Sequence, residues 1–148
     1  MAEISRRRTI AAPQQDVWDV LADYGALAEW VDGADHSSIL YNGDDGLVGT
    51  SRRVQMGRNA LVETITVADE PRTIGYDIAG LPGVLGRLHN QWTLRPAADT
   101  TEVTLTSTVS PVRGPLGPVI AAVVTRVMAK QSDAMLDGLA RRLERTRG

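Results

Sequence analysis

Four polar side chains stand where the sequence pattern predicts an apolar, inward-facing surface: Arg52, Glu63, Asn90 and Gln131. A buried amide needs several hydrogen bonds, which an empty apolar wall cannot supply, so Asn90 requires water or a ligand beside it. An arginine–glutamate pair on such a wall has two interpretations. It can orient a polar group of a ligand, or it can be a structural cross-strand ion pair worth about 0.2–1 kcal/mol. Both interpretations stay open from the sequence alone.

The placement of Arg52 opposite Glu63 follows from a predicted hairpin. Gly57-Arg58 suits a two-residue turn between a strand at 48–56 and a strand at 60–68. Counting outward from this turn places Arg52 directly across from Glu63. The other pairs expected on this face are Met56–Asn59, Val54–Leu61, Thr50–Ile65 and Val48–Val67. A slip of one residue would exchange the two faces, so the interpretation depends on this register.

Alternation along the next three predicted strands, 73–79, 84–95 and 101–109, extends the same apolar face. Leu94 must point inward to meet Val103 on the last strand. The inward side chains that follow from this parity are Ile74, Tyr76, Ile78, Asn90 and Trp92. Ser107 is the expected cross-strand neighbour of Asn90. Trp92 is interpreted first as core, with an indole N–H that still needs a partner.

The end of the chain predicts one long amphipathic helix, because residues 119–145 contain no proline and Pro115 and Pro118 stand where a helix would begin. Apolar residues recur there every three or four positions, which predicts one buried stripe. The members of this stripe are Leu116, Ile120, Val123, Val124, Val127, Ala134, Met135, Leu139 and Leu143.

Gln131 and Gly138 fall at the centre of that stripe. Gln131 has two interpretations. It can be the one polar group on an otherwise flexible, apolar surface formed with Met128 and Met135, or it can bond to a side chain of a strand. A glycine inside a helix costs about 1 kcal/mol relative to alanine, so Gly138 is expected to serve close approach or empty space. The opposite face carries Asp133, Asp137 and Glu144, which are expected to be solvated.

The chain before the hairpin is expected to form a strand (4–10), two short helices (14–23 and 25–30) and a second strand (38–41). Arg6 and Arg8 share alternation parity with Ile4 and Ile10 on the first strand. Either a bulge resets the face, or one arginine points inward. The charged triplet 6–8 is interpreted as solvated or edge-strand arginine, because three charges in isolation are a weak motif for phosphate binding.

The two histidines offer little catalytic chemistry. His89 alternates outward on its strand and is expected at the surface. His36 falls in the loop after the second short helix, where acid–base chemistry is conceivable, but its only nearby carboxylates are Asp32 and Asp35 in the same loop. Neither histidine has metal-ligand spacing, and no Walker loop or dinucleotide fingerprint is present. We therefore expect no metal and no cofactor.

The bulk composition narrows the class of protein. Residues 1–148 are expected to form a single domain, and a net charge of −2 argues against a general nucleic-acid binder. The absence of cysteine excludes disulfides and thiolate catalysis. No signal-peptide core or run of about 20 apolar residues is present. A cytoplasmic protein without a membrane span is the simplest expectation.

Several of these segments, in this order, carry a family resemblance. They are Ile10-Ala11-Ala12-Pro13 before Val17-Trp18, then Leu21-Ala22-Asp23, Trp30, Glu70-Pro71-Arg72, Trp92-Thr93-Leu94-Arg95-Pro96, Thr101-Glu102-Val103 and the terminal Leu139, Leu143 and Glu144. The chain resembles the START-like, or Bet v 1-like, helix-grip superfamily in its bacterial polyketide cyclase/dehydrase (SRPBCC) branch. The resemblance implies an α+β fold in which a curved seven-stranded antiparallel sheet wraps a long C-terminal helix. It also implies a hollow that holds apolar small molecules in many members, but no single reaction.

The leading hypothesis is therefore binding or carriage of a hydrophobic small molecule such as a lipid, isoprenoid or polyketide. Two alternatives stay open: a polyketide cyclase or dehydratase with Glu63 or His36 as the acid–base group, and a module that binds a protein partner without any ligand. The candidate ligand-binding residues are Arg52, Glu63, Tyr76, Asn90, Trp92, Met128, Gln131 and Met135.

Overall fold

The computed structural model describes residues 2–80, 87–110 and 114–147. The element order matches the expected one: a strand, two short helices, six strands and a long helix. These elements are β1 (Ala2–Ile10), α1 (Gln14–Ala22), the 3-10 helix η1 (Tyr24–Glu29), β2 (His36–Tyr41), β3 (Ser51–Met56), β4 (Asn59–Asp69), β5 (Thr73–Ala79), β6 (Leu88–Ala97), β7 (Thr100–Val109) and α2 (Gly117–Arg147). Residues 84–86, expected at the start of the longest strand, lie outside the described residues.

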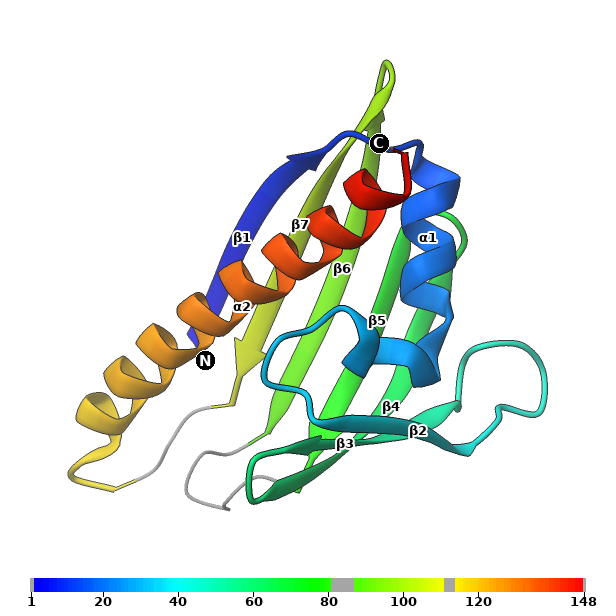
Figure 1. Ribbon diagram of the computed structural model, residues 1–148. Coiled ribbons are helices and arrows are strands. Elements are labelled where there is room, and N and C mark those ends of the chain that lie inside the picture. Colours follow the sequence, from blue (N-terminus) through cyan, green and yellow to red (C-terminus); the bar gives the residue numbers. More distant parts are fainter. Residues whose placement is uncertain (1, 81–86, 111–113, 148) are drawn as a thin grey trace.

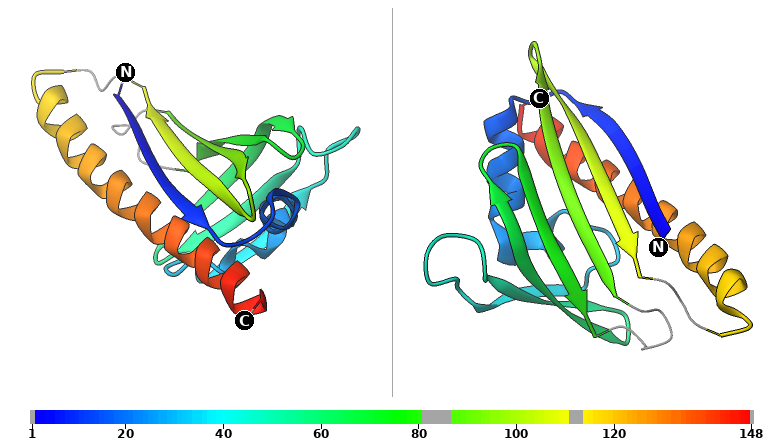
Figure 2. Two further views of the ribbon diagram at one scale, coloured as in Figure 1. Left: turned by 90° about the horizontal axis from the view of Figure 1, so that it is seen from above. Right: turned by 180° about the vertical axis from the view of Figure 1, so that it is seen from behind.

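The seven strands form one antiparallel sheet in the order β1-β7-β6-β5-β4-β3-β2. The sheet curves, and α2 crosses its concave side with α1 and η1 beside it (Figures 1 and 2). The main core lies between these layers, where Trp92, Leu105 and Leu139 are fully buried. This arrangement is the helix-grip fold that the resemblance implied.

The expected hairpin register is confirmed. Arg52 pairs with Glu63 across β3 and β4, and Asn90 pairs with Ser107 across β6 and β7. The expected pairs Met56–Asn59, Val54–Leu61 and Leu94–Val103 are present as well. The inner face of the sheet therefore carries the residues that alternation assigned to it.

Two local expectations at the start of β3 and β2 are wrong. Strand β3 begins at Ser51, and Val48 lies in a turn with 50% of its surface exposed, so the Val48–Val67 pair does not form. An irregularity in β4 between Ile65 and Val67 shifts the register at this point. Strand β2 begins at His36, which is therefore a strand residue and not a loop residue.

Strand β1 contains no β-bulge that would move Arg6 and Arg8 to the other face. Strand β1 pairs with β7 without interruption, so Arg6 and Arg8 lie on the same face as Ile4 and Ile10. Because β1 is an edge strand beside α2, both arginines reach the helix instead of the core. Arg6 Nε lies 3.3 Å from Asp133 Oδ1, and Arg8 pairs with Asp137. The two aspartates are exposed, as expected, and each also forms an ion pair with an arginine of β1.

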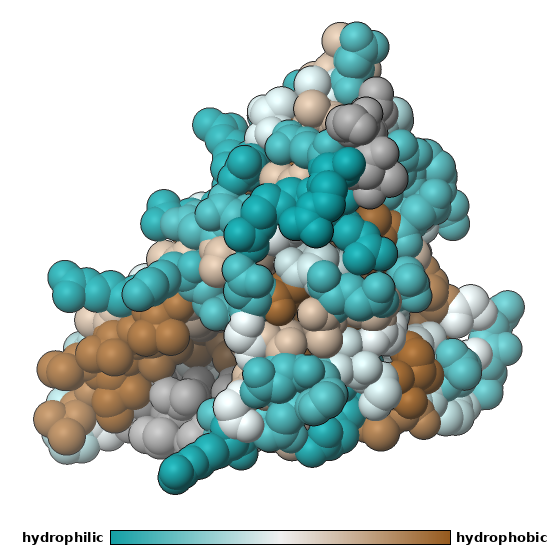
Figure 3. Space-filling model, viewed as in Figure 1, coloured by the Kyte–Doolittle hydropathy of each residue, from teal (hydrophilic) through white to brown (hydrophobic). Residues whose placement is uncertain are grey.

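The predicted stripe of α2 is correct in its second half and only partly correct in its first. Leu139 and Leu143 are buried, but Val123 and Val127 are 58% and 63% exposed. The first half of the helix projects past the sheet (Figures 1 and 2). Figure 3 shows this end as a brown, hydrophobic surface, and the exposed large side chains on it are Leu116, Val119, Val123 and Val127. Of the stripe members expected there, Val124 is buried and Ile120 is half-buried, and with Met128 they pack against Leu88 and Val109.

Gly138 allows α2 to approach the backbone of Trp30 closely. A Cβ atom at this position would lie 2.1 Å from the carbonyl oxygen of Trp30. The helix therefore contacts the backbone at the end of η1 at a position where it lacks a side chain. Among residues 2–80, 87–110 and 114–147, no helix has the length and apolar character needed to cross a membrane.

Candidate functional site: a cavity between the sheet and the long helix

A cavity of about 130 Å³ lies between the concave face of the sheet and α2. Strands β3 to β7, the segment after α1 and the middle of the helix all contribute to its wall. The apolar lining residues are Leu27, Val31, Val54, Met56, Leu61, Ile78, Leu88, Met128 and Met135. The polar ones are Glu63, Asn90, Ser107, Gln131 and Ser132. The cavity wall is thus mainly apolar, with a few hydrogen-bonding side chains.

The structure divides the eight candidate ligand-binding residues into two groups. Glu63, Asn90, Met128, Gln131 and Met135 line the cavity. The other three, Arg52, Tyr76 and Trp92, are buried behind it and border a separate void of about 10 Å³. Alternation placed all of the strand residues on the correct face, but it could not tell which of them reach the open space.

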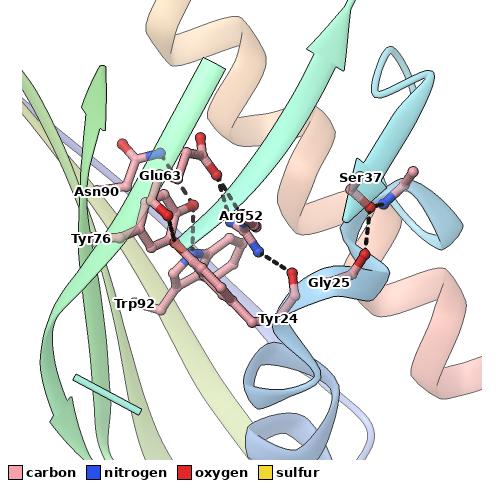
Figure 4. Close-up of polar contacts among 9 residues, drawn as sticks. Tyr24, Gly25, Ser37, Arg52, Glu63, Tyr76, Asn90 and Trp92 are labelled. Atoms are coloured by element: carbon pink, nitrogen blue, oxygen red, sulfur yellow. Dashed lines mark hydrogen bonds and ion pairs between the residues drawn. The ribbon is translucent and has the colours of Figure 1, made fainter. Parts of the chain in front are cut away.

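Arg52 and Glu63 form a buried ion pair. They are only 3% and 6% exposed. Arg52 Nε–H donates to Glu63 Oε1 at 2.8 Å, and Nη2 lies 2.7 Å from the same oxygen (Figure 4). The third nitrogen, Nη1, donates to the carbonyl oxygen of Tyr24 at 3.0 Å. Both charges are therefore neutralised within the wall, which a buried pair requires if it is not to destabilise the fold.

Two tyrosine rings hold the Arg52 guanidinium. Its central carbon lies 3.8 Å from the ring centroid of Tyr24 and 4.8 Å from that of Tyr76. Such cation–π contacts stabilise a desolvated guanidinium by up to about 2 kcal/mol. The Tyr24 hydroxyl also donates to the backbone carbonyl of Glu63 at 3.0 Å. Arg52 is thus packed against two adjacent tyrosine rings and does not line the cavity.

Tyr24 is a site residue that sequence reasoning missed, as are the lining residues Leu27, Val31 and Ser132. Tyr24 is the first residue of η1 and is 3% exposed. A signal was present, because Val17, Leu21 and Tyr24 are spaced by four and three residues and continue one apolar stripe. The break between α1 and η1 after Ala22 hid that continuity.

A second polar network surrounds Asn90. Ser107 Oγ donates to Asn90 Oδ1 at 2.6 Å, and Asn90 Nδ2 donates to the Tyr76 hydroxyl at 3.4 Å. The Trp92 indole N–H donates to the same hydroxyl at 3.3 Å. The expected neighbour of Asn90 is therefore confirmed, and Tyr76 is the partner that the Trp92 indole needed.

A family comparison agrees with this architecture. The family model described as polyketide cyclase / dehydrase and lipid transport matches residues 1–144. The chain belongs to this family. A comparison with curated protein sequences finds no match.

Solved structures show the same fold at low sequence identity. The Zhui aromatase/cyclase from a Streptomyces species is 22% identical with a TM-score of 0.81, over 97% of this chain and 94% of that one. A START superfamily protein from Mycobacterium smegmatis is 17% identical with a TM-score of 0.80, over 97% and 98% of the two chains. Ara h 8.0201 is 16% identical with a TM-score of 0.68, over 93% and 97%.

In this family member the cavity wall offers binding chemistry and little catalytic chemistry. Its described lining residues include no histidine, lysine or cysteine, and its one carboxylate is bound to Arg52. His36 is exposed at the start of β2 and does not line the cavity. His89 lies on the outer face as expected, with Nδ1 2.7 Å from Asp77 Oδ1. Within the described part of the chain, no three acidic or histidine side chains gather as a metal site would require.

Burial shifts the pKa values around the pair. It raises the pKa of Tyr24 and of Tyr76 above the ordinary value of 10.0. Burial alone would lower the pKa of Arg52, but the negative charge of Glu63, supported by the electrostatic interaction with the two tyrosines, outweighs burial and raises that pKa. Arg52 is therefore charged, and both phenols are neutral, throughout the physiological range.

The two buried tyrosines predict a loss of stability in alkali. Above pH 10 the unfolded chain releases its phenol protons while the folded protein keeps them, so unfolding becomes easier as the pH rises. Each tyrosine contributes a slope of about 1.4 kcal/mol per pH unit. Denaturant unfolding at several alkaline pH values gives the free energy of unfolding as a function of pH. The slope of this dependence should be smaller in Tyr24→Phe and in Tyr76→Phe than in the wild-type protein. Tyr41→Phe is the comparison, because the hydrogen bond to Asp44 raises the pKa of this exposed phenol as well, and it should decrease the slope less than either buried variant. Ionisation of both phenols near pH 10 in the folded protein, seen as tyrosinate absorbance, would contradict this expectation.

Proposed function

We propose that this protein binds and carries a hydrophobic small molecule, such as a lipid, isoprenoid or polyketide-like compound, in the cavity between the sheet and α2. The observation that carries the proposal is the cavity itself: a space of about 130 Å³ whose wall is apolar except for five polar side chains. Small-molecule sites share this character, with apolar walls and a few placed polar groups. The description of the family, which includes lipid transport, supports the same proposal.

The volume limits what can fit without rearrangement. An apolar cavity of about 150 Å³ in another protein binds a single benzene molecule. The space here therefore suits one ring or a short aliphatic segment. A larger ligand requires the wall to move, and Met56, Met128 and Met135 line it with flexible side chains that can adapt.

The decisive experiment compares two adjacent residues of α2. Met128 lines the cavity, whereas Val127 faces solvent. Gentle purification followed by native mass spectrometry should detect a bound small molecule, and a panel of lipids and aromatic compounds should raise the melting temperature. Met128→Trp should fill the space and abolish both effects, while Val127→Trp should retain them. No bound mass and no thermal shift with any compound would overturn the proposal.

A cyclase or dehydratase activity is the second candidate. Glu63 presents a carboxylate at the cavity wall, and the similar Zhui structure is named an aromatase/cyclase. The geometry favours Glu63 over His36 as its acid–base group, since His36 lies outside the lining. Turnover of a polyketide-like substrate that persists in Glu63→Gln would exclude this assignment.

A further inference from the structure

The two oxygens of the Glu63 carboxylate have different surroundings. Oε1 receives both nitrogens that Arg52 directs at the carboxylate, at 2.8 and 2.7 Å. Oε2 accepts no hydrogen bond from any of the described residues. Figure 4 shows one oxygen directed at Arg52 and the other directed away from it. Half of the hydrogen-bonding capacity of this buried group is therefore unused by the protein.

An unused carboxylate oxygen in this position needs a donor. Glu63 is 6% exposed and lines the cavity. Its Oε2 keeps some contact with solvent, because among the described residues Trp30 Nε1 is the one fully buried side-chain nitrogen or oxygen without a partner. A carboxylate oxygen accepts hydrogen bonds but cannot donate them, and leaving it unpaired once a ligand covers it is costly. A ligand that displaces water from Glu63 must therefore bring an O–H or N–H group.

The charges near Glu63 restrict this group further. Arg52 and Glu63 cancel each other, and the guanidinium is closed off by the Tyr24 and Tyr76 rings and does not line the cavity. A ligand carboxylate would place a second negative charge against Glu63 without a cation in reach, and an unpaired charge in an apolar site is strongly disfavoured. A ligand cation would meet the already neutralised pair and lose its hydration. A neutral donor avoids both costs.

We propose that Glu63 Oε2 is a specificity subsite that accepts a hydrogen bond from a hydroxyl group, so that the cavity selects neutral, hydroxylated apolar ligands of about one ring and rejects carboxylates. This inference rests on the proposed function, because it assumes that the cavity binds a ligand. It adds the polar end of that ligand and the residue that recognises it.

Three probes of nearly equal shape test the subsite: p-xylene, p-cresol and p-toluate. All three probes share a methyl-substituted ring. At the opposite ring position they carry a methyl, a hydroxyl or a carboxylate group, respectively. Dissociation constants come from NMR titration of the full chain. In the wild-type protein, p-xylene and p-cresol should bind measurably, and the dissociation constant of p-toluate should be at least tenfold larger than theirs. A crystal structure with p-cresol should place its oxygen within hydrogen-bonding distance of Oε2.

Variants separate Glu63 from the other polar groups of the wall. Arg52→Met combined with Glu63→Leu removes both charges, and the ratio of the p-xylene to the p-cresol dissociation constant should fall by about 10-fold or more, as expected for a lost hydrogen bond to a charged group. Gln131→Met is the matched control, since it removes the neighbouring amide and should leave that ratio unchanged.

The outcomes distinguish the subsite from the function. A ratio that survives in the double variant, a ratio that falls equally in Gln131→Met, a p-cresol oxygen placed away from Glu63, or tighter binding of p-toluate than of p-cresol would each overturn the subsite while leaving ligand binding intact. If the double variant does not fold, the order of the three probes in the wild-type protein and the p-cresol complex still decide the question. Failure of all three probes to bind would overturn both proposals.

Discussion

Replacement of Glu63 by alanine is expected to lower the free energy of unfolding by about 3–5 kcal/mol. Arg52 is 3% exposed and would remain charged in the core without its counterion. The tyrosine rings at 3.8 and 4.8 Å and the carbonyl of Tyr24 would be its remaining partners, and they do not carry a compensating charge. Urea unfolding followed by circular dichroism measures the change.

Two controls show whether burial of the charge is the cause. Replacing both partners, with Arg52→Met and Glu63→Leu, should cost much less than Glu63→Ala, because an apolar pair leaves no unpaired charge. Asp133→Asn breaks the pair with Arg6, whose side chains are 46% and 54% exposed, and should cost less than about 1 kcal/mol. A loss for Glu63→Ala as small as that for Asp133→Asn would show that the Arg52–Glu63 pair is solvated.

The second large effect is expected at the buried half of α2. Leu139 is fully buried, so Leu139→Ala should lower the free energy of unfolding by about 2–5 kcal/mol through lost burial and the cavity left behind. Val127 is 63% exposed on the same helix, and Val127→Ala should change the free energy by no more than about 0.5 kcal/mol. Thermal or urea unfolding of the two variants gives the comparison.

This comparison tests the position of the helix directly, because the sequence pattern assigned both residues to one buried stripe. A cost above about 1 kcal/mol for Val127→Ala would show that the first half of the helix packs against the rest of the protein in solution. A small cost for Leu139→Ala would contradict the core described between α2 and the sheet.

Much of the strand pairing of this protein could be predicted from its sequence because it depends on short-range geometry. Strand alternation and a two-residue hairpin turn are properties of a few neighbouring residues, and they placed Arg52 opposite Glu63 and Asn90 opposite Ser107, as the structure confirms. The order of the elements and the resemblance supplied the helix-grip fold.

The errors occur where a local pattern depended on a distant partner. Val127 has the spacing of a core residue, but whether a helix face is buried depends on where the sheet ends, and here the helix extends beyond it. Arg6 and Arg8 have inward parity, yet β1 is an edge strand, so both reach Asp133 and Asp137 on the helix. Periodicity within a segment does not contain this information.

The sequence by itself determined the strands, the long helix and the inward-facing positions of the four polar residues, because periods of two and of 3.6 residues are intrinsic to strands and helices. The curvature of the sheet was implied by the family resemblance. Only the tertiary structure decided which inward residues meet open space. It placed Tyr24 of η1 against Arg52, and it buried Arg52, Tyr76 and Trp92 behind the cavity wall. It also left one oxygen of Glu63 without a partner among the described residues. A cavity wall is the sum of packing between elements distant in sequence, and no single segment encodes it.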